Sequence, residues 1–84
     1  MVRSIIYNYR TNNEGNKFFD TFTVGEEYPI ILDREVLIEA IDVNWSDMSA
    51  TITASFEGLN DQNKPLKTVY EITQVNIHQV ISEL

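Results

Sequence analysis

The feature that most constrains the fold of this chain is a strict alternation of apolar and polar residues along one segment. In residues 50–57, Ala50, Ile52, Ala54 and Phe56 alternate with threonine, serine and glutamate. Neighbouring side chains of a β-strand point to opposite faces, so this period of two predicts a strand with one buried face. We expect Ile52 and Phe56 to lie inward and to be nearly fully buried.

Two segments near the start of the chain alternate in a similar way, with Ile6 as an exception. Residues 3–10 and 17–24 each direct aromatic and aliphatic side chains to one face, namely Ile5, Tyr7 and Tyr9, then Phe18, Phe22 and Val24. Residues 12–16 between them are rich in asparagine and include Gly15. Asparagine and glycine tolerate the positive φ angles that tight turns need. The pattern predicts a β-hairpin with Gly15 in its turn.

Two shorter runs predict further strands. Residues 28–32 follow Gly25, and Pro29 lacks a backbone donor, which places it near a strand start or on an unpaired edge. Residues 67–74 are rich in threonine, valine, tyrosine and isoleucine, which favour strands. They follow a second cluster of turn-forming residues at 58–65. We expect one strand in each run.

Residues 36–45 fit two patterns. A helix that begins at Asp33 would gather on one side Val36, Leu37, Ala40, Ile41 and Asn44. A strand would place on one face Leu37, Ile41, Val43 and Trp45, with Glu39 as the misfit. The short polar connection 46–48 to the regular strand that follows favours a second hairpin. We therefore predict a strand here.

The last residues show a different spacing. Four apolar residues recur at positions i, i+3, i+4 and i+7, the spacing of an amphipathic helix: Ile77, Val80, Ile81 and Leu84. Asn76 can cap such a helix, and Gln79 occupies the place of a capping-box partner. So short a helix is unstable alone in water, and we expect it to form by covering the sheet.

Together these elements predict the fold class. The length of 84 residues suits one domain, and no repeat or linker divides the chain. We expect a single domain, 1–84, that is mostly β. The architecture would be a small antiparallel barrel or compact sandwich of about five to six strands with a short C-terminal helix.

Charge narrows the classes of partner. Thirteen acidic residues against six basic ones give a formal net charge of −7, and the basic residues form no run. Proteins that bind nucleic acids use lysine and arginine to displace counterions from phosphates. We therefore expect no direct binding to nucleic acid or to a membrane surface. The acidic surface either keeps the protein in solution or meets a basic partner, and both interpretations remain open.

The lengths of the apolar runs bear on where in the cell the protein is expected. None reaches the length that spans a bilayer, and residues 1–8 lack the apolar stretch of a signal peptide. The expected location is the cytoplasm.

Residues for catalysis, cofactors or metals are sparse. The chain has no cysteine and a single histidine, His78, which we expect to face solvent on the C-terminal helix. Residues 42–47 resemble a calcium loop, but Asp47 and Thr53 stand where such a loop needs glycine and glutamate. The acidic pairs Glu26/Glu27 and Asp33/Glu35 are of the kind that arises by chance among thirteen acids. We expect no enzyme activity, no cofactor and no metal.

Two adjacent phenylalanines bear on binding. Phe18 and Phe19 cannot both point inward in a regular strand, so Phe19 is expected on the outer face, where exposed aromatics make protein contacts. The alternative is that a bulge or the C-terminal helix buries both.

One short segment resembles a known family. Residues 22–31 run Phe-Thr-Val-Gly-Glu-Glu-Tyr-Pro-Ile-Ile, which is similar to the opening of small SH3-like barrel proteins. Such proteins are common among phages and mobile elements of Gram-positive bacteria. The resemblance covers about ten residues and carries over no site residue. It implies a barrel and an accessory protein of a phage or mobile element.

These observations predict a non-catalytic, acidic module that binds another protein. It would act as an inhibitor or adaptor that occludes a basic surface, with Phe19, Glu26 and Glu27 as partner-binding residues. The alternative is a structural subunit that self-associates through its sheet edges or an aromatic face, which would make it a homo-oligomer.

Overall fold

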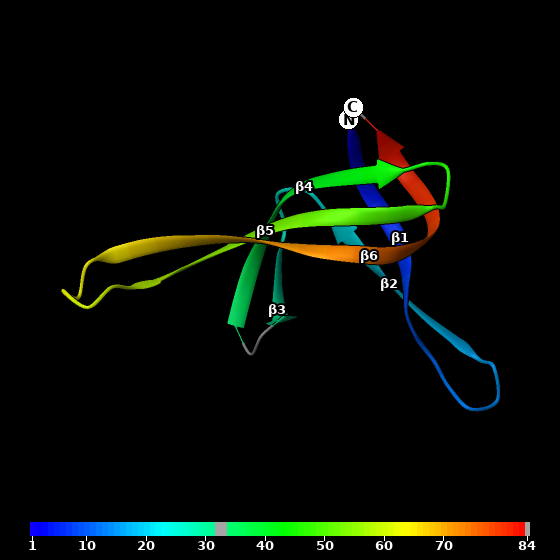
Figure 1. The fold of residues 1–84 in the computed structure, drawn as a ribbon, viewed down its shortest axis with the longest axis horizontal. Coiled ribbons are helices and arrows are strands. Elements are labelled where there is room, and N and C mark those ends of the chain that lie inside the picture. Colours follow the sequence, from blue (N-terminus) through cyan, green and yellow to red (C-terminus); the bar gives the residue numbers. More distant parts are fainter. Residues whose placement is uncertain (32–33, 84) are drawn as a thin grey trace.

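The protein is all-β. In the computed structural model, which describes residues 1–31 and 34–83, six antiparallel strands form one sheet and no helix is present. The strands are β1 (Val2–Thr11), β2 (Lys17–Thr23), β3 (Glu27–Ile31), β4 (Arg34–Asn44), β5 (Ser49–Leu59) and β6 (Pro65–Glu83). Their order across the sheet is β2-β1-β6-β5-β4-β3 (Figure 1). The predicted number of strands is confirmed, and so is a strand rather than a helix at residues 36–44, whereas Trp45 lies in the turn that follows.

Both predicted turn clusters form turns of the same design. The side-chain oxygen of Asn12 accepts hydrogen bonds from the backbone N–H groups of Glu14 and Asn16, at 3.0 and 2.9 Å. Asn60 does the same for residues 62 and 64, at 2.9 and 3.0 Å. The fourth residue of each turn has positive φ, 83° at Gly15 and 64° at Asn63. The predicted role of Gly15 is confirmed.

The C-terminal helix predicted for residues 77–84 is wrong, because residues 65–83 form β6. The first part of this strand pairs with β5 and the last part with β1. The pairing with β1 shifts register at His78, between the pairs Tyr7↔Ile77 and Ile6↔Gln79. A bulge of this kind changes which side chains face inward. The bulge turns both Ile77 and the partly buried Val80 toward the core. Two inward residues of a strand are therefore three positions apart, which is also the spacing of one face of a helix.

Two further outcomes concern the same C-terminal stretch. His78 is exposed, but it lies on a strand instead of a helix. The predicted burial of Ile81 is also wrong, because 48% of this residue is exposed. Leu84 lies outside the described residues.

A second bulge explains the misfit at Glu39. The pairing of β4 with β5 shifts register between Ile38 and Ala40, which leaves Glu39 as the extra residue. Val36 and Ile38 therefore face the core before the bulge, and Ile41 faces it afterwards. The prediction that one face of this strand carries both Leu37 and Trp45 together with Ile41 is therefore wrong. Leu37 does not belong to the core cluster, and Trp45 is exposed.

The core lies between the inner faces of five strands. It consists of Val2, Ile5, Phe22, Val36, Ile38, Ile41, Ala50, Ile52, Ala54 and Ile77. The expected burial of Ile52 is confirmed, with 0% exposed. Phe56 is only partly buried, contrary to prediction, and packs at the margin of the core. The reason is that the β4–β5 pairing ends at Leu37↔Ser55, one residue before it.

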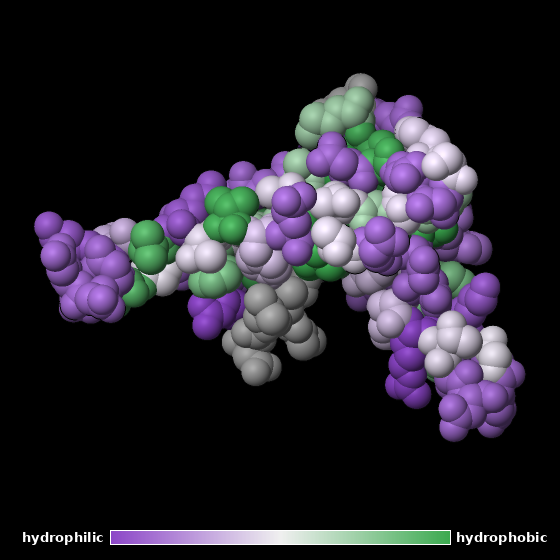
Figure 2. Space-filling model, in the orientation of Figure 1, coloured by the Kyte–Doolittle hydropathy of each residue, from purple (hydrophilic) through white to green (hydrophobic). Residues whose placement is uncertain are grey.

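The molecule is extended, with two hairpin arms. Its radius of gyration is 14.4 Å, whereas a compact chain of this length would have about 12 Å. The β1–β2 arm (residues 9–20) and the β5–β6 arm (residues 57–68) project from the body (Figure 1), and almost all their residues are exposed. Hydrophilic residues cover both tips (Figure 2). The body itself curls, because Val2 on β1 also pairs with Ile41 on β4.

Candidate functional site

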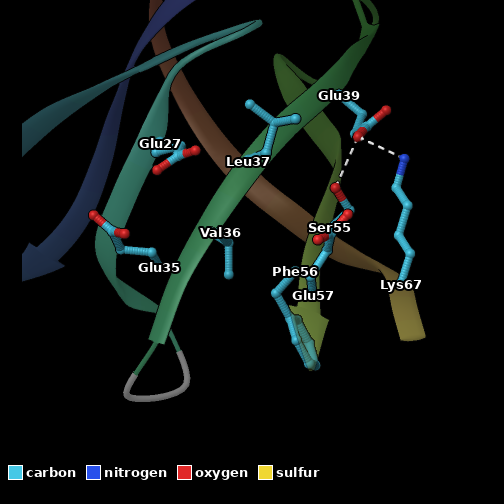
Figure 3. A pocket seen from close by; sticks show the side chains of 9 residues that line it. All are labelled: Glu27, Glu35, Val36, Leu37, Glu39, Ser55, Phe56, Glu57 and Lys67. Carbon is cyan, nitrogen blue, oxygen red and sulfur yellow. Dashed lines mark hydrogen bonds and ion pairs between the residues drawn. The ribbon is translucent and has the colours of Figure 1, made fainter. Parts of the chain in front are cut away.

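A groove opens where β4 and β5 separate. Beyond the pair Leu37↔Ser55, and within residues 1–31 and 34–83, β4 continues beside β3 only and β5 continues beside β6 only. The space between the separating strands has a volume of about 470 Å³ (Figure 3). It is lined by Glu27, Glu35, Val36, Leu37, Glu39, Ser55, Phe56, Glu57 and Lys67.

The lining of this groove is strongly acidic. Four carboxylates face one ammonium group, that of Lys67. Glu27 and Glu35 lie on one side of the groove, and Glu57 and Lys67 come from the other (Figure 3). Lys67 forms an ion pair with Glu39, at 3.1 Å between Nζ and Oε1. Within residues 1–31 and 34–83, the carboxylates of Glu27, Glu35 and Glu57 have no hydrogen-bond or ion-pair partner, so they give the groove a negative potential.

Glu39 is held differently from the other three glutamates. The hydroxyl of Ser55 donates to its Oε1 at 2.7 Å, and the Lys67 ammonium contacts the same oxygen. The hydrogen bond from Ser55 and then the one from Lys67 lower the pKa of Glu39 below its ordinary value of 4.5. The bulge at Glu39 is therefore tied to β5 and β6 by its side chain, at the point where the β4–β5 ladder shifts register.

The groove also has apolar walls. Val36 is buried, Phe56 is partly buried, and both extend toward the same end of the groove (Figure 3). The guanidinium carbon of Arg34 lies 4.3 Å from the centre of the Phe56 ring, within the range of a cation–π contact. The groove therefore offers a partner apolar contact at Val36 and Phe56 as well as the charge of its carboxylates.

The turn before β3 positions the predicted residues Glu26 and Glu27. Gly25 adopts a φ of 90°, which glycine takes without strain, and its N–H donates to the carbonyl of Ile38 at 2.8 Å. The N–H of Ile38 in turn donates to the carbonyl of Glu26 at 3.1 Å. This turn is therefore fixed to β4, and Glu27 enters the groove directly after it, while Glu26 stays exposed beside it.

Phe19 lies on a different surface. It is 42% exposed on β2, opposite Asn8, and its ring centroid lies 4.5 Å from that of His78. Phe18 is exposed as well, so the alternative in which both phenylalanines are buried is wrong. The structure does not join Phe19 to the groove that contains Glu27. Their roles in partner binding stay predictions.

Sequence reasoning missed most of the groove. Glu35, Glu39 and Glu57 come together only through the pairing of β3, β4 and β5. One local signal existed, because Glu39 interrupts the alternation of its strand and so marks a bulge. Asp33, the proposed mate of Glu35, lies outside the described residues.

The calcium-loop resemblance at residues 42–47 corresponds to an ordinary polar turn. The side chains of Asn44 and Asp47 accept hydrogen bonds from Ser46 and Ser49, as in a polar turn. Within the described residues, no three acidic or histidine side chains are grouped to hold a metal ion, and no helix could cross a bilayer. No protein-family model, curated protein or solved structure matches the chain.

Proposed function

We propose that this protein is a non-catalytic binding module whose acidic groove docks on a basic surface of a larger protein, as an inhibitor or adaptor. The observation that carries this proposal is a groove lined by Phe56 and by three carboxylates, those of Glu27, Glu35 and Glu57, which have no hydrogen-bond or ion-pair partner among the described residues. A negative field accelerates encounter with a basic partner, and an aromatic contact slows dissociation.

The predicted residues have distinct parts in this proposal. Glu26 and Glu27 act on encounter, so their reversal to lysine lowers the association rate. Phe19 lies on the β1–β2 arm and supplies a second, aromatic contact, so Phe19→Ala raises the dissociation rate. Association slows as salt rises, because ions screen the field of the groove.

The test uses two variants of equal net charge. Glu27→Lys/Glu35→Lys alters the groove, and Glu14→Lys/Asp61→Lys alters the two arm tips, which are exposed and carry no side-chain ion pair in the described structure. Binding kinetics are measured with the partner captured from the source cell. We expect the groove variant to bind far more weakly than the tip variant. Equal weakening of both would show that only net charge matters and would refute docking at the groove.

The proposal also includes a barrel architecture and a biological context for the protein. The pair Val2↔Ile41 supports a ring of β1, β6, β5 and β4, that is, a small and partly closed barrel. The resemblance of residues 22–31 to SH3-like barrel proteins supports an accessory protein of a phage or mobile element that acts in the cytoplasm.

A second candidate function is self-association through β2. This strand lies at one edge of the sheet and exposes Phe18 and Phe19. An exposed apolar edge favours pairing with another chain. Light scattering over a range of concentrations tests it: an oligomer that Phe19→Ala dissociates supports a structural subunit, and a monomer at all concentrations refutes one.

A further inference from the structure

Two open strand edges bound the groove. The pairing of β5 with β6 continues for four residues after the pairing with β4 has ended, from Phe56↔Thr68 to Leu59↔Pro65. On the other side, β4 pairs with β3 as far as Arg34↔Ile31. In the part of the chain that the structure describes, residues 56–59 and 34–36 therefore have a strand partner on one side only.

An edge of this kind offers backbone hydrogen bonds. In an extended strand, the N–H and C=O groups of alternate residues point to each side, so residues 56–59 present unpaired groups to the groove. Gly58 lies within this edge, and the space that a side chain would occupy there is open. One face of this part of β5 is therefore uncovered, and the unpaired backbone groups lie along its edge.

We propose that an extended segment of the partner adds to β5 at residues 56–59 as a further strand, and that this segment alternates basic and apolar residues. This inference rests on the proposed function and specifies the form of the partner. The backbone supplies affinity and the side chains supply selectivity, as in other cases of strand addition.

The alternation follows from the faces of the sheet. Leu37 and Ser55 are direct partners and so share a face, to which Glu35 and Glu57, two residues away, also belong. Val36 and Phe56 lie on the opposite face. An added strand would direct every second side chain toward the glutamates, where lysine or arginine fits. The side chains between them would meet Phe56 and Val36, where apolar residues fit.

The same pattern argues against a second copy of this chain as the occupant. Its six basic residues are Arg3, Arg10, Lys17, Arg34, Lys64 and Lys67, and no two of them are two positions apart. The chain therefore contains no segment with basic side chains on one face of a strand. The occupant is a segment of another protein.

The experiment uses three blocked peptides of about six residues, the usual length of a strand. The first alternates lysine and valine, the second has the same composition in two blocks, and the third is the alternating peptide with N-methyl groups on every second amide. The third keeps charge and side chains but cannot donate backbone hydrogen bonds on that edge. Binding is measured by titration and located by amide chemical shifts.

We expect the alternating peptide to shift the amides of residues 56–59 and to bind about tenfold more tightly than the other two. Glu35→Lys/Glu57→Lys should abolish this binding, whereas Glu14→Lys/Asp61→Lys should preserve it. Failure of the alternating peptide to bind, or shifts at β2 or β3 instead, would overturn the proposal.

The outcomes also separate this inference from the proposed function. If all three peptides bind equally and Glu35→Lys/Glu57→Lys weakens the binding of each, strand addition is overturned while acidic docking stands. If Glu35→Lys/Glu57→Lys changes the binding of none of them, the acidic docking itself fails. A dimer that Glu35→Lys/Glu57→Lys dissociates would identify a second copy as the occupant and would also overturn the proposal.

Discussion

The last strand offers the sharpest test of the fold, because two isoleucines four residues apart have different surroundings. Ile77 is 9% exposed and packs in the core, whereas Ile81 is 48% exposed. A helix with the spacing of residues 77–84 would bury both side chains on one stripe. Replacing each residue by alanine therefore distinguishes the strand from the helix.

The size of the effect follows from burial. At about 0.8 kcal/mol for each buried methylene-sized group, loss of the ethyl and γ-methyl groups of Ile77 costs about 2.4 kcal/mol. The cavity that remains increases this cost, so Ile77→Ala should lower the free energy of unfolding by about 2–4 kcal/mol. The same groups of Ile81 are half in water and leave no closed cavity, so Ile81→Ala should cost about 1 kcal/mol.

The assay is urea unfolding followed by far-ultraviolet circular dichroism. The slope of the unfolding free energy against urea should stay constant, and only the midpoint should move. In thermal unfolding, the difference between the variants corresponds to roughly 10 °C in Tm for a domain of this size. Equal losses in the two variants would refute the strand and restore the helix.

Three further predictions concern single residues. Gln74 lies in a bulge of β6 with a φ of 59°, which costs non-glycine residues about 1 kcal/mol, so Gln74→Gly should raise the urea midpoint and Gln74→Val should lower it. Burial and then the Asp20 carboxylate raise the pKa of Tyr7 from 10.0 to about 12, so its stabilising effect is complete below pH 10 and is lost as pH rises toward 12. Unfolding measured across this range should show a smaller loss for Tyr7→Phe than for the native chain. The lowered pKa of Glu39 stabilises the fold above pH 4.5, and this stabilisation is lost at lower pH, so Glu39→Gln should be less stable at pH 7 and lose less on acidification.

Local pattern was sufficient where strands are regular. Residues 50–57 alternate without interruption, and β5 contains them with Ile52 in the core. The turn at residues 12–16 was also predictable, because asparagine and glycine there provide side-chain acceptors and positive φ. In both cases the determining interactions lie within a few residues of one another.

Prediction from the spacing of apolar residues failed where strands contain bulges. An extra residue at His78 places Ile77 and Val80 three positions apart on one face, a spacing that a helix would also produce. Periodicity alone cannot tell the two apart, and the choice depends on pairing with β1, which is remote in sequence. The groove was beyond prediction for a related reason, because Glu35 and Glu57 meet only through the register that pairs Leu37 with Ser55. Only Glu27, which directly follows a turn visible in the sequence, was identified in advance.

The double pairing of β6 has a consequence for how fast the chain folds. Residues near its end pair with β1, as in Val2↔Glu83, so these contacts join positions separated by almost the whole sequence. Closing so long a loop lowers the entropy of the chain before any stabilising contact has formed. Folding rates accordingly fall as the mean sequence separation of contacts rises. The hairpins β1–β2 and β4–β5 can form locally, but β1 keeps an open inner edge until residues 76–83 reach it. The last step in folding is therefore expected to be the arrival of β6 beside β1, and aggregation during refolding should depend on how long that edge stays exposed.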